Sequence, residues 1–193
     1  MSAPLNRIAV FCGSKGGTSP IYVEQAKALG VYLALNNIEL VYGGACSGLM
    51  GAVASGCLSE GGTVIGVMPV ALESQDAIQP GLTQFFDVDS VQERKAKMLS
   101  LSDGFIALPG GSGTLDELFE VITLSQMGAH NKPVALLNVN HFYTPLMQFM
   151  AGAKDQGFIH PDYFDMLIVA SDIAAIVQQM KAFIHPHAPT QTP

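Results

Sequence analysis

The sequence predicts an α/β protein, a single domain in which a parallel sheet carries helices on both faces. Short apolar runs alternate with helical patterns from one end of the chain to the other. The apolar runs are nearly continuous, which is typical of strands that are buried on both faces. At 193 residues, 49% of them hydrophobic, the chain is most simply one compact domain with a large core.

The expected elements follow in strict alternation, which specifies a parallel sheet. Five strands are expected at residues 7–12, 39–42, 63–68, 104–108 and 134–137. Six helices are expected at residues 21–36, 49–60, 91–101, 115–127, 142–156 and 172–183. Residues 1–184 are expected to form the domain, and residues 185–193, which hold three prolines, a disordered tail.

Composition limits the partners and the compartment. The net charge is −7 and no basic run is present, so we expect no nucleic acid partner. No apolar stretch approaches the roughly 18 residues of a membrane span, and no apolar segment precedes Ile8, so neither membrane insertion nor secretion is expected. The three cysteines form no CxxC pair, which fits a reduced, cytoplasmic compartment.

The strongest motif follows the fourth expected strand. It reads Pro109-Gly110-Gly111-Ser112-Gly113-Thr114-Leu115-Asp116-Glu117. Glycines let backbone amides approach a ligand, and a helix that starts here offers unpaired N–H groups and a positive dipole end. The alternative is a tight turn closed by a capping box, because Thr114 and Glu117 have T-x-x-E spacing. Three glycines in four residues favour a phosphate site over the turn alone.

A second glycine loop follows the second expected strand and begins with Gly43 and Gly44. Taken alone, it fits a phosphate loop and an ordinary turn equally well. When neighbouring strands both end in such loops, a shared cradle is favoured, that is, one phosphate site formed by both loops. The loop after the first strand is a weaker signal. No G-x-G-x-x-G follows the first strand and no P-loop motif occurs, so the usual dinucleotide and nucleoside triphosphate sites are not expected.

A pair of cations marks the third expected helix. The helix is expected to start after Ser90, which has capping-box spacing with Glu93. Arg94 and Lys95 lie within about one turn of Met98, so both project near the apolar stripe. Two interpretations remain open: the cations bind an anion, either a carboxylate or a phosphate, or they extend past the stripe to water.

Other chemistry finds little support. The five histidines show no metal-ligand spacing with carboxylates or cysteines, so no metal site is expected. No G-x-S-x-G elbow is present, which argues against an α/β-hydrolase triad. A pyridoxal phosphate enzyme needs a Schiff-base lysine, and no lysine of this chain lies in a recognisable setting for one, the candidates being Lys15, Lys27, Lys132 and Lys154.

Taken together, the motifs resemble the LOG family, which is named from the plant "lonely guy" cytokinin-activating enzymes and was often mislabelled as lysine decarboxylase. The resemblance covers the chain from Val10 to about Phe158. The segments that carry it are Val10-Phe11-Cys12-Gly13-Ser14, Val41-Tyr42-Gly43-Gly44, Gly48-Leu49-Met50-Gly51, Val64-Ile65-Gly66-Val67, Glu93-Arg94-Lys95-Ala96 and Asp103 to Gly111. An Arg-Lys pair on one helix and P-G-G-x-G-T-x-x-E on the next loop and helix are a specific combination.

The resemblance implies a Rossmann-like fold, a homodimer and a phosphoribohydrolase that needs no cofactor. The substrates would be nucleoside 5′-monophosphates, namely adenosine 5′-monophosphates with or without an N6 substituent, and the products the free base and ribose 5-phosphate. Arg94 and Glu117 would be the catalytic pair. The substrate-binding positions would be Lys95, Gly110, Gly111, Ser112, Gly113, Thr114, Leu115, Asp116 and Thr123, to which the shared cradle adds Gly43 and Gly44.

One departure concerns the loop after the third strand. The family usually has a glutamate where this sequence has Asp76, and often a basic residue where it has Val70. Asp76 keeps the carboxylate on a side chain that is one methylene shorter, so selectivity for the base or the ribose is expected to differ.

The residues also suggest a mechanism. Cleavage of an N-glycosidic bond builds positive charge on C1′, and a nearby carboxylate stabilises that charge and orients the attacking water. Glu117, expected on the first helical turn and kept ionised by the helix dipole and Arg94, is the candidate. The alternative is a non-catalytic protein that binds nucleotides or carries molybdenum cofactor, but a pure carrier needs no carboxylate at the sugar.

Overall fold

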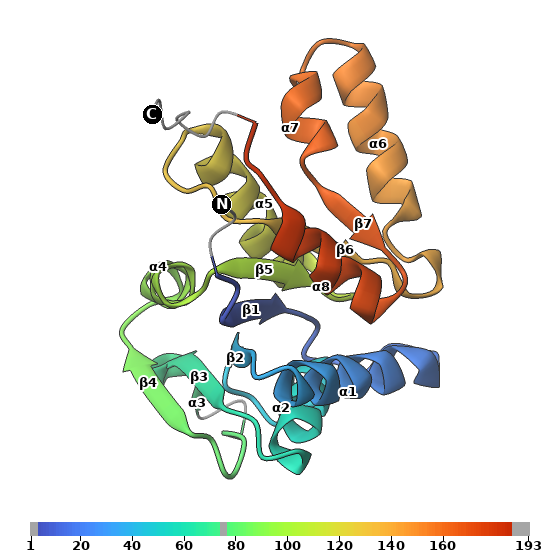
Figure 1. Cartoon of the computed structure of the whole chain (residues 1–193). Helices are drawn as coiled ribbons and strands as arrows, with labels where there is room; N and C mark the ends of the chain where they lie inside the picture. The colour runs from blue at the N-terminus through green and yellow to red at the C-terminus, as the bar shows by residue number, and fades with distance from the viewer. Residues whose placement is uncertain (1–3, 74–76, 187–193) are drawn as a thin grey trace.

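The computed structural model describes residues 4–73 and 77–186 and forms one seven-stranded parallel sheet, in the order β4-β3-β2-β1-β5-β6-β7 (Figure 1). The strands are β1 (Arg7–Phe11), β2 (Glu39–Tyr42), β3 (Val64–Pro69), β4 (Gln84–Val88), β5 (Gly104–Ala107), β6 (Val134–Leu137) and β7 (Ile168–Ala170). The helices are α1 (Pro20–Leu35), α2 (Gly48–Ser59), α3 (Val70–Glu73), α4 (Val91–Leu101), α5 (Ser112–Gln126), α6 (Thr144–Asp155), α7 (Pro161–Asp165) and α8 (Ile173–Ala182), with a 3₁₀ turn at Val139–His141.

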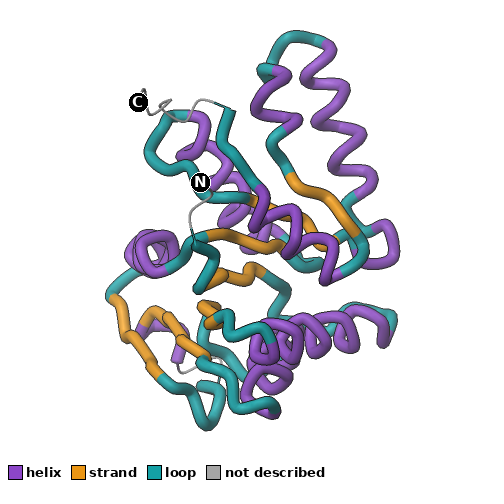
Figure 2. Tube along the Cα trace, in the orientation of Figure 1, coloured by secondary structure: helices purple, strands orange, loops and turns teal. Residues whose placement is uncertain are grey.

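Helices cover both faces of the sheet, as expected. One hydrophobic core lies under α1, α2 and α8, and a second lies under α4, α5 and α6. Figure 2 shows the strands running through the middle of the molecule between these layers. Strands β3, β5 and β6 are buried at every residue, which explains their continuous apolar sequence.

The predicted fold class is confirmed, and the five predicted strands agree with the structure to within a residue at each end. Two strands were missed. β4 is an edge strand with a mixed polar and apolar sequence, and β7 has only three residues, so neither forms a long apolar run. Helix α5 begins at Ser112, three residues earlier than predicted.

The order of the sheet places a crevice at β1. The chain runs from β1 through β2 and β3 to β4, and then crosses back to pair β5 with the other side of β1. Such a reversal of strand order leaves a crevice at the carboxyl ends of the strands, where ligands of α/β proteins bind. The loops after β1 and β5 meet there, and the N–H of Gly13 donates to the carbonyl of Pro109 at 3.0 Å.

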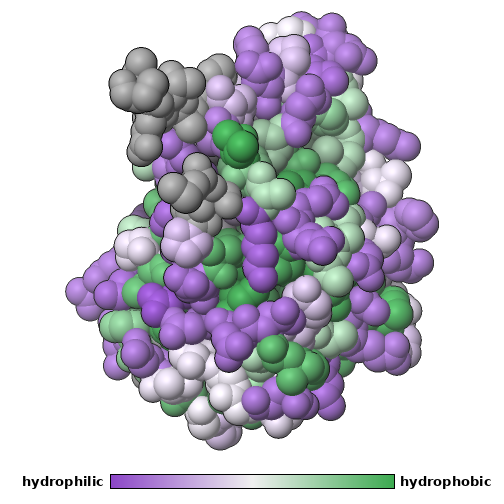
Figure 3. Space-filling model, viewed as in Figure 1, coloured by the Kyte–Doolittle hydropathy of each residue, from purple (hydrophilic) through white to green (hydrophobic). Residues whose placement is uncertain are grey.

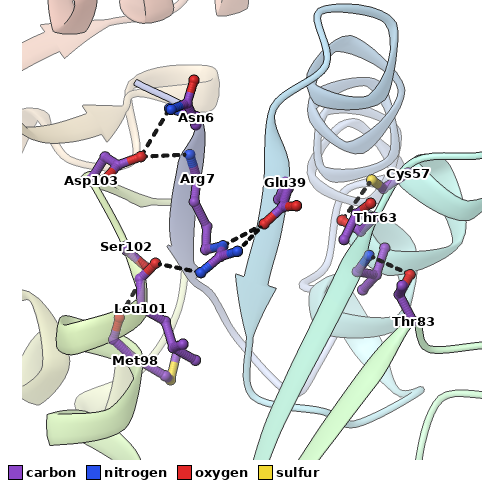
Figure 4. Close-up of polar contacts among 11 residues, drawn as sticks. Asn6, Arg7, Glu39, Cys57, Thr63, Thr83, Met98, Leu101, Ser102 and Asp103 are labelled. Carbon is purple, nitrogen blue, oxygen red and sulfur yellow. Dashed lines mark hydrogen bonds and ion pairs between the residues drawn. The ribbon is translucent and has the colours of Figure 1, made fainter. Parts of the chain in front are cut away.

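Charged side chains link neighbouring strands at their amino ends, opposite the crevice (Figure 4). Arg7 on β1 forms an ion pair with Glu39 on β2, and its Nη1 also donates to the carbonyl of Leu101 at 3.2 Å. Asp103, just before β5, accepts the backbone N–H groups of Asn6 and Arg7, each at 2.9 Å. These contacts join the starts of the three central strands.

Within residues 4–73 and 77–186, no helix is both long enough and apolar enough to cross a bilayer. On the face shown in Figure 3, apolar residues lie in groups among polar ones.

The start of the predicted tail is ordered and packed. His185, which was assigned to a disordered tail, is only 5% exposed, and its Nε2 lies 3.1 Å from the hydroxyl of Ser125 on α5. Its ring also packs edge-on against Phe183. The ordered domain therefore reaches at least Pro186, and residues 187–193 lie outside the described residues.

Replacing His185 with alanine is expected to destabilise the protein by about 1–3 kcal/mol, because it removes a buried side chain and leaves the Ser125 hydroxyl without this hydrogen bond. Urea unfolding followed by circular dichroism measures the effect. An unchanged midpoint would mean that residues 183–186 contribute nothing to the fold.

Candidate active site

One cavity of about 570 Å³ opens at the crevice between the carboxyl ends of the central strands. Its walls come from the loop after β1, the starts of α1, α2 and α4, the glycine loop after β5, the start of α5, and Phe142. The cavity thus brings together the two strongest motifs of the sequence, the Arg94 helix and the P-G-G-x-G-T loop.

The glycine loop presents the N-terminus of α5 to this cavity. The helix begins at Ser112 with Gly111 as its N-cap, so its first N–H groups have no intrahelical partners. A Cβ added to Gly111 or Gly113 would meet no heavy atom within 4 Å, and both residues line the cavity. The helix start is therefore open to an anion, which the dipole of α5 also favours.

The capping-box alternative for this loop is wrong. Thr114 lies inside the first turn rather than at the N-cap, and it is 4% exposed. A Cβ on Gly110 would lie only 2.0 Å from the Thr114 hydroxyl oxygen, so glycine is needed at that position to accommodate the threonine. Glu117 therefore has no capping role and lies on the second turn of α5, not on the first as expected.

Glu117 is paired with Arg94 across the two helices. The Nη2 of Arg94 donates to Oε1 of Glu117 at 3.0 Å, and the side chains are only 16% and 11% exposed, respectively. Burial raises the pKa of Glu117 to about 7, although the positive charge of Arg94 acts to lower it. The expectation that the dipole and Arg94 keep this carboxyl fully ionised is thus corrected: near neutral pH it gains and loses a proton.

Gly43 explains how the arginine reaches this position. A Cβ at Gly43 would lie 2.5 Å from Nη2 of Arg94 and 2.8 Å from the sulfur of Met50. The guanidinium therefore lies over the end of β2, where only glycine leaves room for it. Gly43 and Gly44, which were predicted to bind substrate, are buried and do not line the cavity. Gly44 has a positive φ of 84° and turns the chain beside Phe85.

Lys95 also lies outside the cavity. Its ammonium group forms ion pairs with Asp116 at 2.9 Å and Glu120 at 2.5 Å, both on α5. Of the interpretations left open for Lys95, binding to a carboxylate is therefore the one found, rather than extension of the side chain to water. Asp116 itself lines the cavity. In this arrangement Lys95 ties α4 to α5 and fixes the helix that carries Glu117.

Leu115 and Thr123 lie on the other side of α5. They line an open groove of about 580 Å³ together with Phe119 and Leu124. The predicted substrate-binding residues of α5 therefore divide between two surfaces of one helix. Asp76 lies outside the described residues, so its predicted role remains a prediction.

Several residues of the cavity were not predicted as site residues. They are Cys12, Gly13, Ser14, Lys15, Gly16, Gly17, Tyr22, Leu49, Met50, Val91, Pro109 and Phe142. The loop after β1 gave only a weak glycine signal, yet it forms one side of the cavity. Within residues 4–73 and 77–186, no group of three or more histidine, cysteine, aspartate or glutamate side chains is placed to hold a metal ion.

Sequence comparison finds close relatives of one kind. The profile of a family described as "possible lysine decarboxylase" matches residues 50–180. A cytokinin riboside 5′-monophosphate phosphoribohydrolase of Rhodococcoides fascians is 43% identical over 176 residues, which is 91% of this chain and 89% of that protein. A protein of the same name from Arabidopsis thaliana is 40% identical over 187 residues, 97% of this chain and 88% of the relative.

Structural comparison adds a second kind of neighbour. A molybdenum cofactor carrier protein from Chlamydomonas reinhardtii superposes with a TM-score of 0.69 at 26% identity, covering 93% of this chain and all of that chain. The DNA processing protein A of Helicobacter pylori has a TM-score of 0.57 at 17% identity, covering 92% of this chain and 81% of that chain, and shares the fold alone.

Proposed function

This chain belongs to the family described as possible lysine decarboxylases, and it is similar to a cytokinin riboside 5′-monophosphate phosphoribohydrolase of Rhodococcoides fascians over most of both chains. We propose that it hydrolyses the N-glycosidic bond of adenosine 5′-monophosphates, with or without an N6 substituent. The products are the free base and ribose 5-phosphate. The predicted LOG resemblance is confirmed. The observation that carries the mechanism is the buried pair of Glu117 and Arg94 beside an open helix N-terminus.

In this proposal the 5′-phosphate binds at the start of α5. The N–H groups of Ser112, Gly113 and Thr114 have no intrahelical partners and carry the positive end of the helix dipole. Glu117 lies one turn further along the same helix, so a phosphate held at the helix start places the ribose beside its carboxylate. Binding energy from the phosphate thereby positions C1′ for attack.

The chemical step then requires an ionised Glu117. Water attacks C1′ as the bond to the base breaks; the bonding electrons leave with the base, which takes up a proton. The carboxylate stabilises the positive charge that develops on C1′ and the ring oxygen, and accepts the proton of the water. Arg94 holds Oε1 of Glu117 in place.

The pH dependence follows from the raised pKa of Glu117. The ionised carboxylate is the active form, so kcat/KM is expected to rise with pH, to fall about tenfold per unit below pH 7 and to level off above it. Rates of base release between pH 5 and 9 measure this. The substrate phosphate titrates near pH 6, so affinity is measured at each pH as the control. A flat profile across this range would contradict the role of Glu117.

Replacing Gly113 with alanine is expected to weaken the affinity for AMP at least about tenfold without loss of stability, because the added methyl group projects into the cavity and meets no protein atom. Gly152→Ala is the matched control: that glycine also lies in a helix and also has open space around it, but it is outside the cavity. Calorimetric titration with AMP compares the two. Equal affinities would argue against a phosphate at this helix start.

We further propose that a second copy of the chain covers the groove on the outer side of α5. This groove holds Leu115 and Thr123, which the family resemblance assigns to substrate binding although they lie outside the cavity. A homodimer that covers this surface would extend the walls of the site. The molar mass in solution, from light scattering of the purified protein, tests this proposal, and a monomer at the concentration of the activity assay would contradict it.

The competing proposal is a carrier or sensor, favoured by the likeness in fold to the Chlamydomonas reinhardtii carrier protein. Chromatography of products after incubation with AMP, with isopentenyladenosine 5′-monophosphate and with the two nucleosides distinguishes the two. Release of base from the monophosphates alone supports the hydrolase and its need for the 5′-phosphate. Binding of nucleotide by the folded protein without any release of base would favour the carrier.

A further inference from the structure

The cavity extends beyond the start of α5 to an aromatic wall formed by Tyr22 and Phe142. The two rings meet edge to face, with centroids 6.1 Å apart and an interplanar angle of 77°. Phe142 is 40% exposed, so part of its ring is open to the cavity that it lines. Lys15, Gly16 and Gly17 line the stretch of cavity that leads from the helix start toward this wall.

The backbone on both sides of the wall adopts costly conformations. Asn140 and His141, directly before Phe142, both have positive φ angles, 48° and 59°, which non-glycine residues rarely adopt. Strain of this kind is retained mainly at functional sites. Gly17 has φ 76°, and a Cβ there would lie 2.7 Å from the Tyr22 ring, so only glycine accommodates the ring.

The order of the strands separates this wall from the catalytic pair. Arg94 lies over Gly43 at the end of β2, whereas Phe142 follows β6. In the order β2-β1-β5-β6 the ends of β2 and β6 are three strand spacings apart, about 14 Å, and Phe142 reaches back from β6 to meet Tyr22 at the start of α1. The phosphate site at the ends of β1 and β5 lies between them. A monophosphate that reaches from there to Glu117 extends toward β2, and its base lies away from the aromatic wall.

We propose that the aromatic wall binds a second planar group linked through the 5′-phosphate, so that the cavity takes 5′–5′ dinucleotides joined by a pyrophosphate. This rests on the proposed position of the phosphate at α5. The first phosphate lies at the start of α5, the second beside the exposed Lys15, and the second base against Tyr22 and Phe142. The missing G-x-G-x-x-G is no obstacle, because that motif serves a pyrophosphate at the first helix of the sheet, not at α5.

Calorimetric titration of the purified full chain with diadenosine 5′,5′-diphosphate, ADP and AMP tests the proposal. The dinucleotide is expected to bind about tenfold more tightly than ADP, the contribution of one base stacked on an aromatic side chain. Phe142→Ala and Phe142→Leu should each remove this difference. Phe149→Ala is the matched control, because Phe149 is 71% exposed and does not line the cavity, and it should leave the difference intact.

Two results would overturn the proposal. Equal affinities for the dinucleotide and ADP would show that the wall contributes nothing to binding. Equal losses for AMP and the dinucleotide in both Phe142 variants would place the wall against the monophosphate itself. Thermal unfolding of each variant checks that it is folded. The deciding comparison is the affinity of the dinucleotide against that of ADP, and neither is the monophosphate that the proposed hydrolysis cleaves. Failure to release base, which would contradict the proposed hydrolysis, therefore leaves this result interpretable.

Discussion

Glu117→Gln is expected to lower kcat for base release by about 10²–10⁴-fold while the Kd for AMP changes little. Glutamine keeps the size and the hydrogen bonding of the side chain, so Arg94 retains an oxygen partner in the place of Oε1. It cannot carry the negative charge that stabilises C1′, and it cannot accept a proton from water. Single-turnover rates and calorimetric titration on the same preparation separate the two quantities.

The neighbouring carboxylate provides the control for this substitution. Asp116 also lines the cavity, but it is more exposed and bonds Lys95. If Glu117 is the group that ionises near pH 7, Asp116→Asn should retain a pH profile with that inflection, whereas Glu117→Gln should lose it. Turnover of Glu117→Gln within a few-fold of the unsubstituted protein would remove Glu117 from the chemistry.

Arg94→Ala is expected to lower kcat/KM by about 10²–10³-fold through both activity and affinity. Without the guanidinium, the buried carboxyl of Glu117 loses the positive charge that most lowers its pKa, so that pKa rises further and less of the active form is present at pH 7. The pH at which kcat/KM levels off should therefore be higher in this variant. Kinetics from pH 6 to 10 measure the shift.

Arg7 supplies a matched control for this second substitution. It too pairs with a glutamate, Glu39, but this pair lies at the amino ends of the strands, whereas the cavity lies at their carboxyl ends (Figure 4). Arg7→Ala should reduce stability without moving the pH at which kcat/KM levels off. If both alanine variants changed activity in parallel and this pH stayed in place, the effect of Arg94 would be one of stability alone.

Predictions of strands and site residues from the sequence were most accurate where a sequence pattern has a single physical cause. Continuous apolar runs predicted five strands because only strands buried on both faces need them, and Arg94 with Glu117 were predicted as a pair that the structure places 3.0 Å apart. The start of α5 was placed too late, because the T-x-x-E spacing of Thr114 and Glu117 imitates a capping box. Local spacing did not reveal that Gly111 is the N-cap.

The roles of the other site residues depend on tertiary contacts, which the sequence does not reveal. Gly43 was predicted to touch a ligand, but its lack of a side chain serves Arg94, which arrives from a helix some 50 residues later in the chain. Lys95 was assigned to substrate by the family resemblance, yet adjacent residues of a helix face different directions, and Lys95 bonds Asp116 and Glu120 on α5. Phe142 carries no motif, and its part in the cavity depends on the path of the backbone through Asn140 and His141.

The central pairing of β1 with β5 also has a consequence during synthesis. Ile8 pairs with Gly104, so the strands that frame the crevice are joined only after the intervening chain has been made. Long-range parallel pairing is slow, because the ordering of the intervening chain precedes any gain from the contact. A nascent chain that stops before α5 has neither the helix start nor Glu117. With the 5′-phosphate site proposed at the start of α5, nucleotide is therefore expected to stabilise only chains that have emerged beyond α5.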